Sequence, residues 1–265
     1  MLVYISRFSF PRHPLVASHY MTKFFLRLDK MHIFDLKGII AIAAGSLLLN
    51  LVQNCNALGR TQQARMNNLN AQMAAFQEKQ PHKMPPLRII DLSKDGGWAT
   101  LSGKLIKAAN TRALVPWLKH TADKYHAGHG GHHSSVRKVF YSLAAIEDII
   151  YKSPMFLSDV QKEELQSQLD KMGRHWMHLR HLSDVAGCDF WQITPKVHIG
   201  ICAVGEQARL INPRFVQNYG EESLIGRMTK IWSASANGPY VKSSQRLVMT
   251  RYLVGLILRI SSEFD

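Results

Sequence analysis

The strongest constraint on the fold is an apolar run over residues 38–52, with the sequence GIIAIAAGSLLLNLV. A membrane-spanning helix needs about twenty consecutive apolar residues. This run is shorter and contains Ser46 and Asn50. In a helix over residues 34–54, apolar side chains would point in almost every direction, which is typical of a helix packed on several sides. We therefore expect a buried core helix and no membrane partner.

The first part of the chain, residues 1–28, lacks the pattern of a secretory signal. Arg7 and Arg12 interrupt the apolar stretch that such a signal requires. Pro11 and Pro14 break any helix there. We expect an irregular N-terminal segment.

Cysteine usage indicates a reducing compartment. The chain has three cysteines, Cys55, Cys188 and Cys202, which lie far apart and form no C-x-x-C pair. An odd number of widely spaced cysteines predicts neither a disulfide framework nor a zinc or redox motif. The protein is therefore expected to be intracellular and not secreted.

Helical periodicity, caps and proline positions predict a mainly α fold, a helical bundle with few strand signals. Ser158 with Gln161 forms a capping box, Pro195 suits a first helical turn, and Pro116 predicts a kink. The glycine- and histidine-rich residues 126–135 predict a flexible loop. The expected helices cover residues 34–54, 56–80, 98–120, 136–151, 158–181, 195–210, 221–235 and 242–260.

Proline- and glycine-rich stretches divide the chain. The expected parts are the irregular segment 1–28, a core helix and an amphipathic helix over 29–80, a linker over 81–97, a helical region over 98–194 and a C-terminal helical region over 195–265. The linker carries three prolines and a Gly-Gly turn.

The charge points to an anionic partner. Thirty-three Lys and Arg residues against nineteen Asp and Glu residues give a formal net charge of +14 and a pI of about 9.8. Nucleic acid is the first candidate, because neutralising phosphates releases condensed counterions. An anionic membrane surface, a ribosome-like assembly or a merely solubilising surface fits the same charge.

Three motifs occur in a definite order. The first is Asp29-Lys30-Met31-His32 followed by Gly38, the second is Pro195-Lys196-Val197-His198, and the third is Asn212-Pro213 followed by Glu222-Ser223-Leu224-Ile225-Gly226-Arg227. Together they resemble the C-terminal half of DDE transposases of the CACTA type and related mobile-element proteins. The resemblance implies that the helices between Gly38 and Trp191 are an α-helical insertion beside the C-terminal part of an incomplete RNase H-like domain.

The resemblance also implies a chemistry. In such enzymes three carboxylates hold two Mg²⁺ or Mn²⁺ ions that activate water or a 3′-hydroxyl for phosphoryl transfer on DNA. Here Asp29 and Glu222 would be the catalytic metal ligands, and His32 would support Asp29 or contact phosphate. The residues expected at nucleic acid are His32, Lys196, His198, Arg214, Arg227 and Lys230.

The expected metal site is incomplete. The first aspartate of the triad should lie well upstream of Asp29, and none of the preceding residues is acidic. The sequence therefore indicates a transposase-derived, DNA-associated protein that is not catalytic alone. Purely structural roles are the alternative for the two acids: Asp29 as a helix N-cap, and Glu222 in a first helical turn. The alternative function is a basic α-helical structural or interaction subunit of a nucleoprotein assembly, with a second copy or another protein as partner.

Histidines suggest two further features. His126, His129, His132 and His133, with His120 upstream, could bind Zn²⁺, Ni²⁺ or Cu²⁺. Structural zinc sites usually include cysteine, so a mobile loop with weak metal affinity is the favoured interpretation.

A second basic group lies around Trp176. It consists of His175, His178 and His181 with Lys171, Arg174 and Arg180. This group is either a phosphate-facing, partly aromatic helix surface or an ordinary solvated face.

Overall fold

The computed structural model describes residues 29–78, 80, 84–93, 97–102 and 107–216, all within one compact unit. Its α-helices are α2 (Ile39–Asn54), α3 (Gln62–Gln77), α4 (Ala108–Ala113), α5 (Val115–Tyr125), α6 (Gly131–Lys152), α7 (Asp159–Val185) and α8 (Pro195–Ala208). A π-helical turn, η2 (Met31–Asp35), and three 3-10 turns, η3 (Asn56–Leu58), η4 (Ile89–Leu92) and η5 (Pro213–Val216), complete the helical elements. Over these ranges the only β pairing is an isolated bridge between Ser93 and Ala99. The predicted mainly α fold is confirmed, and an RNase H-like domain stays a prediction.

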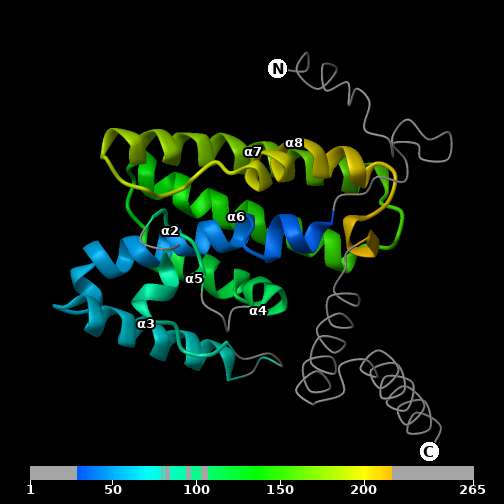
Figure 1. Cartoon of the computed structure of the whole chain (residues 1–265). Coiled ribbons are helices and arrows are strands. Elements are labelled where there is room, and N and C mark those ends of the chain that lie inside the picture. Colours follow the sequence, from blue (N-terminus) through cyan, green and yellow to red (C-terminus); the bar gives the residue numbers. More distant parts are fainter. Residues whose placement is uncertain (1–28, 79, 81–83, 94–96, 103–106, 217–265) are drawn as a thin grey trace, which may run out of the picture. The chain divides into compact units, whose positions relative to one another are not determined.

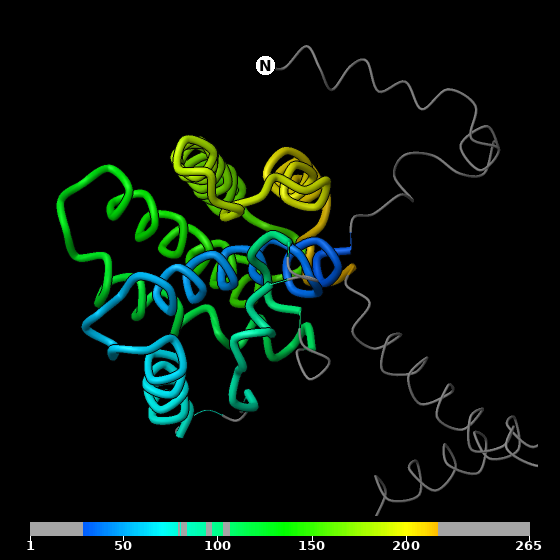
Figure 2. The backbone as a smooth tube through the Cα atoms, turned by 60° about the vertical axis from the view of Figure 1, so that its left-hand side comes forward, coloured from blue at the N-terminus to red at the C-terminus, as the bar shows by residue number. Residues whose placement is uncertain are grey.

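The helix α2 runs through the middle of this unit (Figure 1). The long helices α6 and α7 pack side by side, and α8 packs against α7. On the other side of α2 lie α3 and α4, an arrangement that is also visible after rotation (Figure 2). The helix α5 packs against both α2 and α6, so it joins the two sides.

The apolar run forms the core helix that its composition predicts. From Ile39 to Leu48 every residue of α2 is buried, because other elements of the chain cover it on all sides. By length and composition Met31–Asn54 is the one candidate membrane span in the described part of the chain, and 78% of its most apolar window is buried inside the protein. Such burial is typical of the core helix of a globular fold.

Capping residues fix where three helices begin. The Thr61 hydroxyl accepts a hydrogen bond from the Ala64 amide and begins α3. Ser158 and Gln161 form the predicted capping box of α7. Thr194 caps α8, whose first residue is Pro195. The helices predicted over 158–181 and 195–210 are therefore confirmed with small shifts at their C-terminal ends.

The helix predicted over 98–120 is wrong in its first part. Residues 98–102 are non-helical and cross α2, where the Leu101 amide donates to the carbonyl of Ala41 at 3.0 Å. The Ala99 amide donates to the Asp189 carbonyl at 3.0 Å. Distant segments thus satisfy the backbone groups that a helix would have satisfied locally. The helical part divides into α4 and α5, and Pro116 lies in the first turn of α5 rather than at a kink.

Other boundaries also differ from prediction. The helix expected over residues 56–80 is α3, which begins at Gln62 after the 3-10 turn η3 and ends at Gln77. The loop expected over residues 126–135 ends early, because α6 already begins at Gly131. The helix expected from residue 34 begins at Ile39, since the π-helical turn η2 and the left-handed Lys37 (φ 52°) precede it. The helices expected after residue 220 lie outside the described residues.

A close backbone crossing explains the glycine inside α2. A Cβ added to Gly45 would lie 2.4 Å from both the amide nitrogen and the Cα of Thr100, closer than any real contact. The neighbouring Ser46 hydroxyl accepts a hydrogen bond from the Trp191 amide at 2.9 Å. The Gly45-Ser46 pair therefore holds two non-helical segments against the core helix.

We predict that Gly45→Ala destabilises the protein by about 1–3 kcal/mol, the usual cost of overpacking. On an exposed helix the same change would stabilise by about 0.5–1 kcal/mol, so the sign of the effect identifies the crossing. Urea denaturation followed by circular dichroism measures the difference. Gly130→Ala is the control, because its Cβ would meet only His133 at an ordinary 3.7 Å. Stabilisation by Gly45→Ala would contradict the crossing.

Candidate functional site

The first motif forms a tight polar turn at η2. The Asp29 carboxylate accepts a hydrogen bond from the Met31 amide at 2.9 Å. Its other oxygen lies 2.5 Å from Nδ1 of His32, whose side chain is half exposed. The bond from Met31 is compatible with the structural alternative for Asp29, a residue at the start of a helical turn, and its role as a metal ligand supported by His32 stays a prediction.

Gly38 of the same motif is required by packing. A Cβ at this position would lie 1.9 Å from the carbonyl oxygen of Ile33. The chain therefore folds back on η2 immediately before α2, which keeps Asp29 and His32 at the start of the core helix.

Directly beneath this turn lies a buried ion network. The Lys30 ammonium contacts Asp35 at 2.8 Å and Glu147 of α6 at 2.7 Å, and the side chains of Lys30 and Asp35 have no solvent exposure. Burial opposes the charge on Lys30, but attraction to Glu147 and Asp35 outweighs it and raises the lysine pKa. Burial also opposes the charge on Glu147: it raises the pKa of this carboxylate, although the attraction of Lys30 lowers it. The network therefore joins η2 to α6 through charges that depend on one another.

Cationic groups gather around the ring of Tyr151. Lys30, Arg112 and Arg214 lie 4.8, 4.2 and 5.6 Å from its centroid, within the range of cation–π attraction. Arg214 also donates to the Tyr151 carbonyl at 2.6 Å. The predicted nucleic-acid residue Arg214 is thus anchored to α6, with an exposed side chain.

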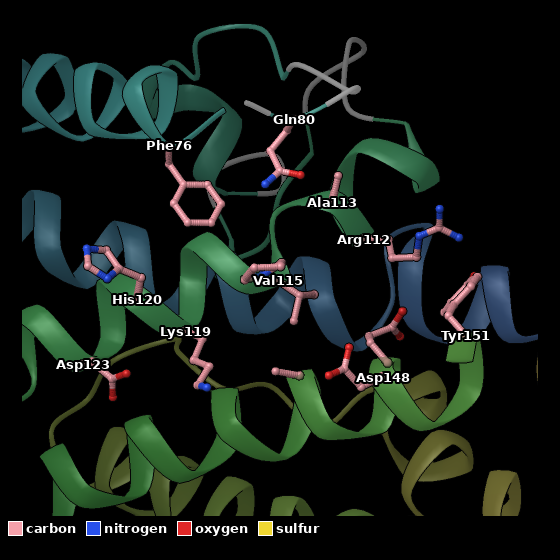
Figure 3. Close-up of a pocket in the computed structure, with 13 residues that line it drawn as sticks. Phe76, Gln80, Arg112, Ala113, Val115, Lys119, His120, Asp123, Asp148 and Tyr151 are labelled. Atoms are coloured by element: carbon pink, nitrogen blue, oxygen red, sulfur yellow. The ribbon is translucent and has the colours of Figure 1, made fainter. Parts of the chain in front are cut away.

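A groove of about 730 Å³ opens beside this ring, between α3, α4, α5 and α6. Arg112 and Tyr151 lie at one end of it, and His120 and Asp123 lie at the other (Figure 3). Glu147 and Asp148 also line it. Because charges of both signs are mixed along the groove, it does not present a uniformly cationic path for a phosphate backbone.

The second motif packs against the first. Gly200 of α8 lies so close to η2 and α2 that a Cβ there would meet side-chain atoms of Ile33 and Ile39 at 3.0 and 2.3 Å. The Lys196 ammonium donates to the Leu36 carbonyl at 2.8 Å. Burial and the nearby charge of Lys37 lower the pKa of Lys196, and Asp29 acts in the opposite direction. Two motifs far apart in the sequence therefore share one edge of the protein.

The remaining predicted site residues divide into two sets. His198 is exposed on α8 and lies 3.8 Å from the sulfur of Cys202. Glu222, Arg227 and Lys230 lie outside the described residues, so the expected meeting of Asp29 and Glu222 stays a prediction. Within the described ranges, Asp29 belongs to no group of three residues suited to hold a metal.

Two interpretations of the basic group on α7 were open, and the position of Trp176 does not support the partly aromatic, phosphate-facing surface. Trp176 is fully buried and donates its indole N–H to the Trp191 carbonyl at 3.0 Å. Arg180 is paired with Asp184 and donates to the Phe190 carbonyl at 3.1 Å. These residues hold the connection before α8, so the tryptophan offers no face to a base.

Sequence reasoning missed Lys30, Asp35 and Glu147 as an interacting group. One signal was present: Glu147 falls on the apolar stripe of α6, beside Leu143 and Ile150. A carboxylate on a buried stripe indicates a buried cationic partner, because an unpaired charge there is costly. The identity of that partner depends on tertiary packing.

Comparison with known proteins adds no relative. No protein-family model matches the sequence, and no curated protein or solved structure matches it. The family resemblance rests on the three motifs.

We predict that Lys30→Met destabilises the protein by about 3–5 kcal/mol, because it leaves two buried carboxylates without their cation. Adding Asp35→Asn and Glu147→Gln removes those charges and should recover part of the loss. Denaturant unfolding measures both effects. Lys152→Met is the control, because it breaks an exposed pair with Asp148 and should cost at most about 1 kcal/mol.

The stability lost by Lys30→Met should depend on pH. Burial raises the pKa of Glu147, and loss of Lys30 removes an attraction that lowers it, so the folded variant binds a proton that the unfolded chain releases. Stability of the variant relative to the native protein therefore increases as pH falls from 8 to 5. An equal loss at both pH values would show that the ion network does not carry the effect.

Proposed function

We propose that this chain is a transposase-derived, DNA-associated protein with an incomplete metal site, located in the nucleus or another reducing compartment. The observation that carries the proposal is the packing of η2 against the beginning of α8. It gathers Asp29, His32, Lys37 and Lys196 from the first two motifs and their neighbours along one edge, which we call the η2–α8 edge.

The η2–α8 edge has the chemistry of a phosphate-binding surface. Lys37 is exposed, and the ammonium of Lys196 lies close enough for each charge to affect the other. Thr194 begins α8 at the same edge, and the N-terminal end of a helix favours an anion. The net charge of +14 supports the same partner, because it would draw a polyanion toward the protein from a distance.

The alternative function, an interaction subunit, required an apolar face covered by a partner. The apolar run over residues 38–52 is not free for this role, because the protein's own helices cover it. The apolar residues 252–260 lie outside the described residues. We therefore place DNA association first.

We predict that binding to a duplex DNA of random sequence weakens steeply between about 50 and 200 mM salt, because bound lysines displace counterions. Lys37→Gln and Lys196→Gln should each reduce the slope of log affinity against log salt by about 0.9. Fluorescence anisotropy across a salt series measures the slope.

Lys124→Gln provides a matched control for these variants. Lys124 is exposed near the end of α5, contacts Gln72 of α3 at 3.0 Å and does not belong to the η2–α8 edge. Its loss should leave the slope nearly unchanged. Equal slopes for all three variants would mean that diffuse charge, not the η2–α8 edge, binds DNA, and a flat salt response of the native protein would favour an interaction subunit.

A second prediction concerns the expected metal ligands. If Asp29 and Glu222 share one ion, Mn²⁺ titration followed by electron paramagnetic resonance should show a weak site that Asp29→Asn and Glu222→Gln each weaken at least about tenfold, since hard ions require oxygen ligands. Asp159→Asn is the control, because that carboxylate is exposed and pairs with Lys162. If both variants bound Mn²⁺ with the affinity of the native protein, Asp29 and Glu222 would not share a metal site.

A further inference from the structure

We propose that His126, His132 and His133 form a binding site for one divalent transition-metal ion of the zinc type. One ring nitrogen from each histidine lies within 4.8 Å of the other two. The Nδ1 atoms of His126 and His133 are 3.1 Å apart. Two imidazole nitrogens bound to one tetrahedral zinc ion, each about 2.0–2.1 Å from it, lie roughly 3.3–3.4 Å apart. Small side-chain rotations therefore bring the three nitrogens to ligand distances.

The fold holds the three rings together. His126 follows the last turn of α5, where its amide donates to the Ala122 carbonyl at 2.9 Å, and its residue is only 3% exposed. His132 and His133 belong to the first turn of α6. The corner between these helices passes directly over the His133 ring, since a Cβ at Gly128 would lie 3.1 Å from it. The histidine cluster is therefore part of a helix–helix corner, not of a loose loop.

One buried nitrogen points to a ligand. Nε2 of His126 is buried and has no hydrogen-bond partner among the described residues. A buried polar atom without a partner is costly, and such atoms often mark a site for water or an ion. An ion bound through Nε2 of His126 would give this nitrogen its partner, whereas an ion bound through Nδ1, the atom that faces His133, would leave Nε2–H to water.

The cluster favours the protonation state that binds metal. Burial, with the neighbouring His132, His133 and Arg137, lowers the pKa of His126 to about 4. Burial, His133 and His178 of α7 also lower the pKa of His132. Neutral imidazoles are the ligating form, so an ion does not have to displace many protons near neutral pH.

The donor set selects the metal. Three imidazoles without thiolate or carboxylate suit Zn²⁺, Cu²⁺ or Ni²⁺, whereas Mg²⁺ and Ca²⁺ require oxygen ligands. A fourth position is open to water or to His178, whose Nε2 lies 3.4 Å from where a Cβ on Gly131 would be. The site is chemically distinct from the Mg²⁺ or Mn²⁺ site expected at Asp29, and it does not rest on the proposed DNA association.

The test is zinc binding by the full chain. We expect isothermal calorimetry with Zn²⁺ alone to give one equivalent per chain. His132→Gln and His133→Gln should each weaken binding at least about tenfold, because each removes one of three ligands. His120→Gln and His181→Gln are matched controls, since both histidines are exposed and neither belongs to the cluster.

Folding of each variant is checked by circular dichroism, and both test positions are only partly buried, unlike His126. Thermal unfolding gives an independent readout: Zn²⁺ should raise the midpoint of the native protein and of the controls but not of the two test variants. Absence of a one-equivalent zinc site in the native protein would overturn the proposal. So would equal zinc affinity in native, test and control proteins.

Discussion

The arrangement of the predicted site depends on the buried ion pairs that the Lys30 ammonium makes with Asp35 and Glu147. The ammonium lies between Asp35 of η2 and Glu147 of α6, and all three charges are largely withdrawn from water. Desolvation makes each charge costly alone, so the turn is stable only where α6 supplies its carboxylate. Lys30 is buried, and Asp29 is adjacent to it in the chain, so the burial of Lys30 fixes the position of Asp29. The ion network thereby holds the polar turn at Asp29 and His32 against α6, and η2 also packs against α8.

Helices were predictable where the signal is local. The capping box at Ser158 and Gln161, the proline at position 195 and the apolar stripe of α6 each depend on neighbouring residues, and the structure contains those helices. Residues 98–102 were not predictable in this way. Their backbone groups bond to Ala41, Leu92 and Asp189, so the segment is extended only because distant parts of the chain are already in place.

The candidate site was predictable to a similar extent. The motifs predicted a shared site for Asp29, His32 and Lys196, and the structure brings their segments together, while their function stays a prediction. The motif pattern gave no sign that Lys30 is buried, because an Asp-Lys-Met-His turn would look the same with its lysine in water. The histidine-rich stretch was recognised as a metal candidate, but the expected loop is shorter than predicted, because α6 begins at Gly131. The deciding feature, the packing of His126 under the first turn of α6, is tertiary.

The histidine cluster and the ion network that holds η2 lie toward opposite ends of one helix. His133 and Glu147 are both on α6, and at about 1.5 Å per residue they are separated by roughly 21 Å along its axis. Groups this far apart without shared partners usually contribute independently to stability. The two ends also differ in charge. Metal binding at the histidine end requires neutral imidazoles, whereas the ion network at the other end requires a charged Lys30. A metal ion bound at the histidine cluster would therefore stabilise the α5–α6 corner without altering the η2–α8 edge, so the proposed metal binding and the proposed DNA association can be tested separately.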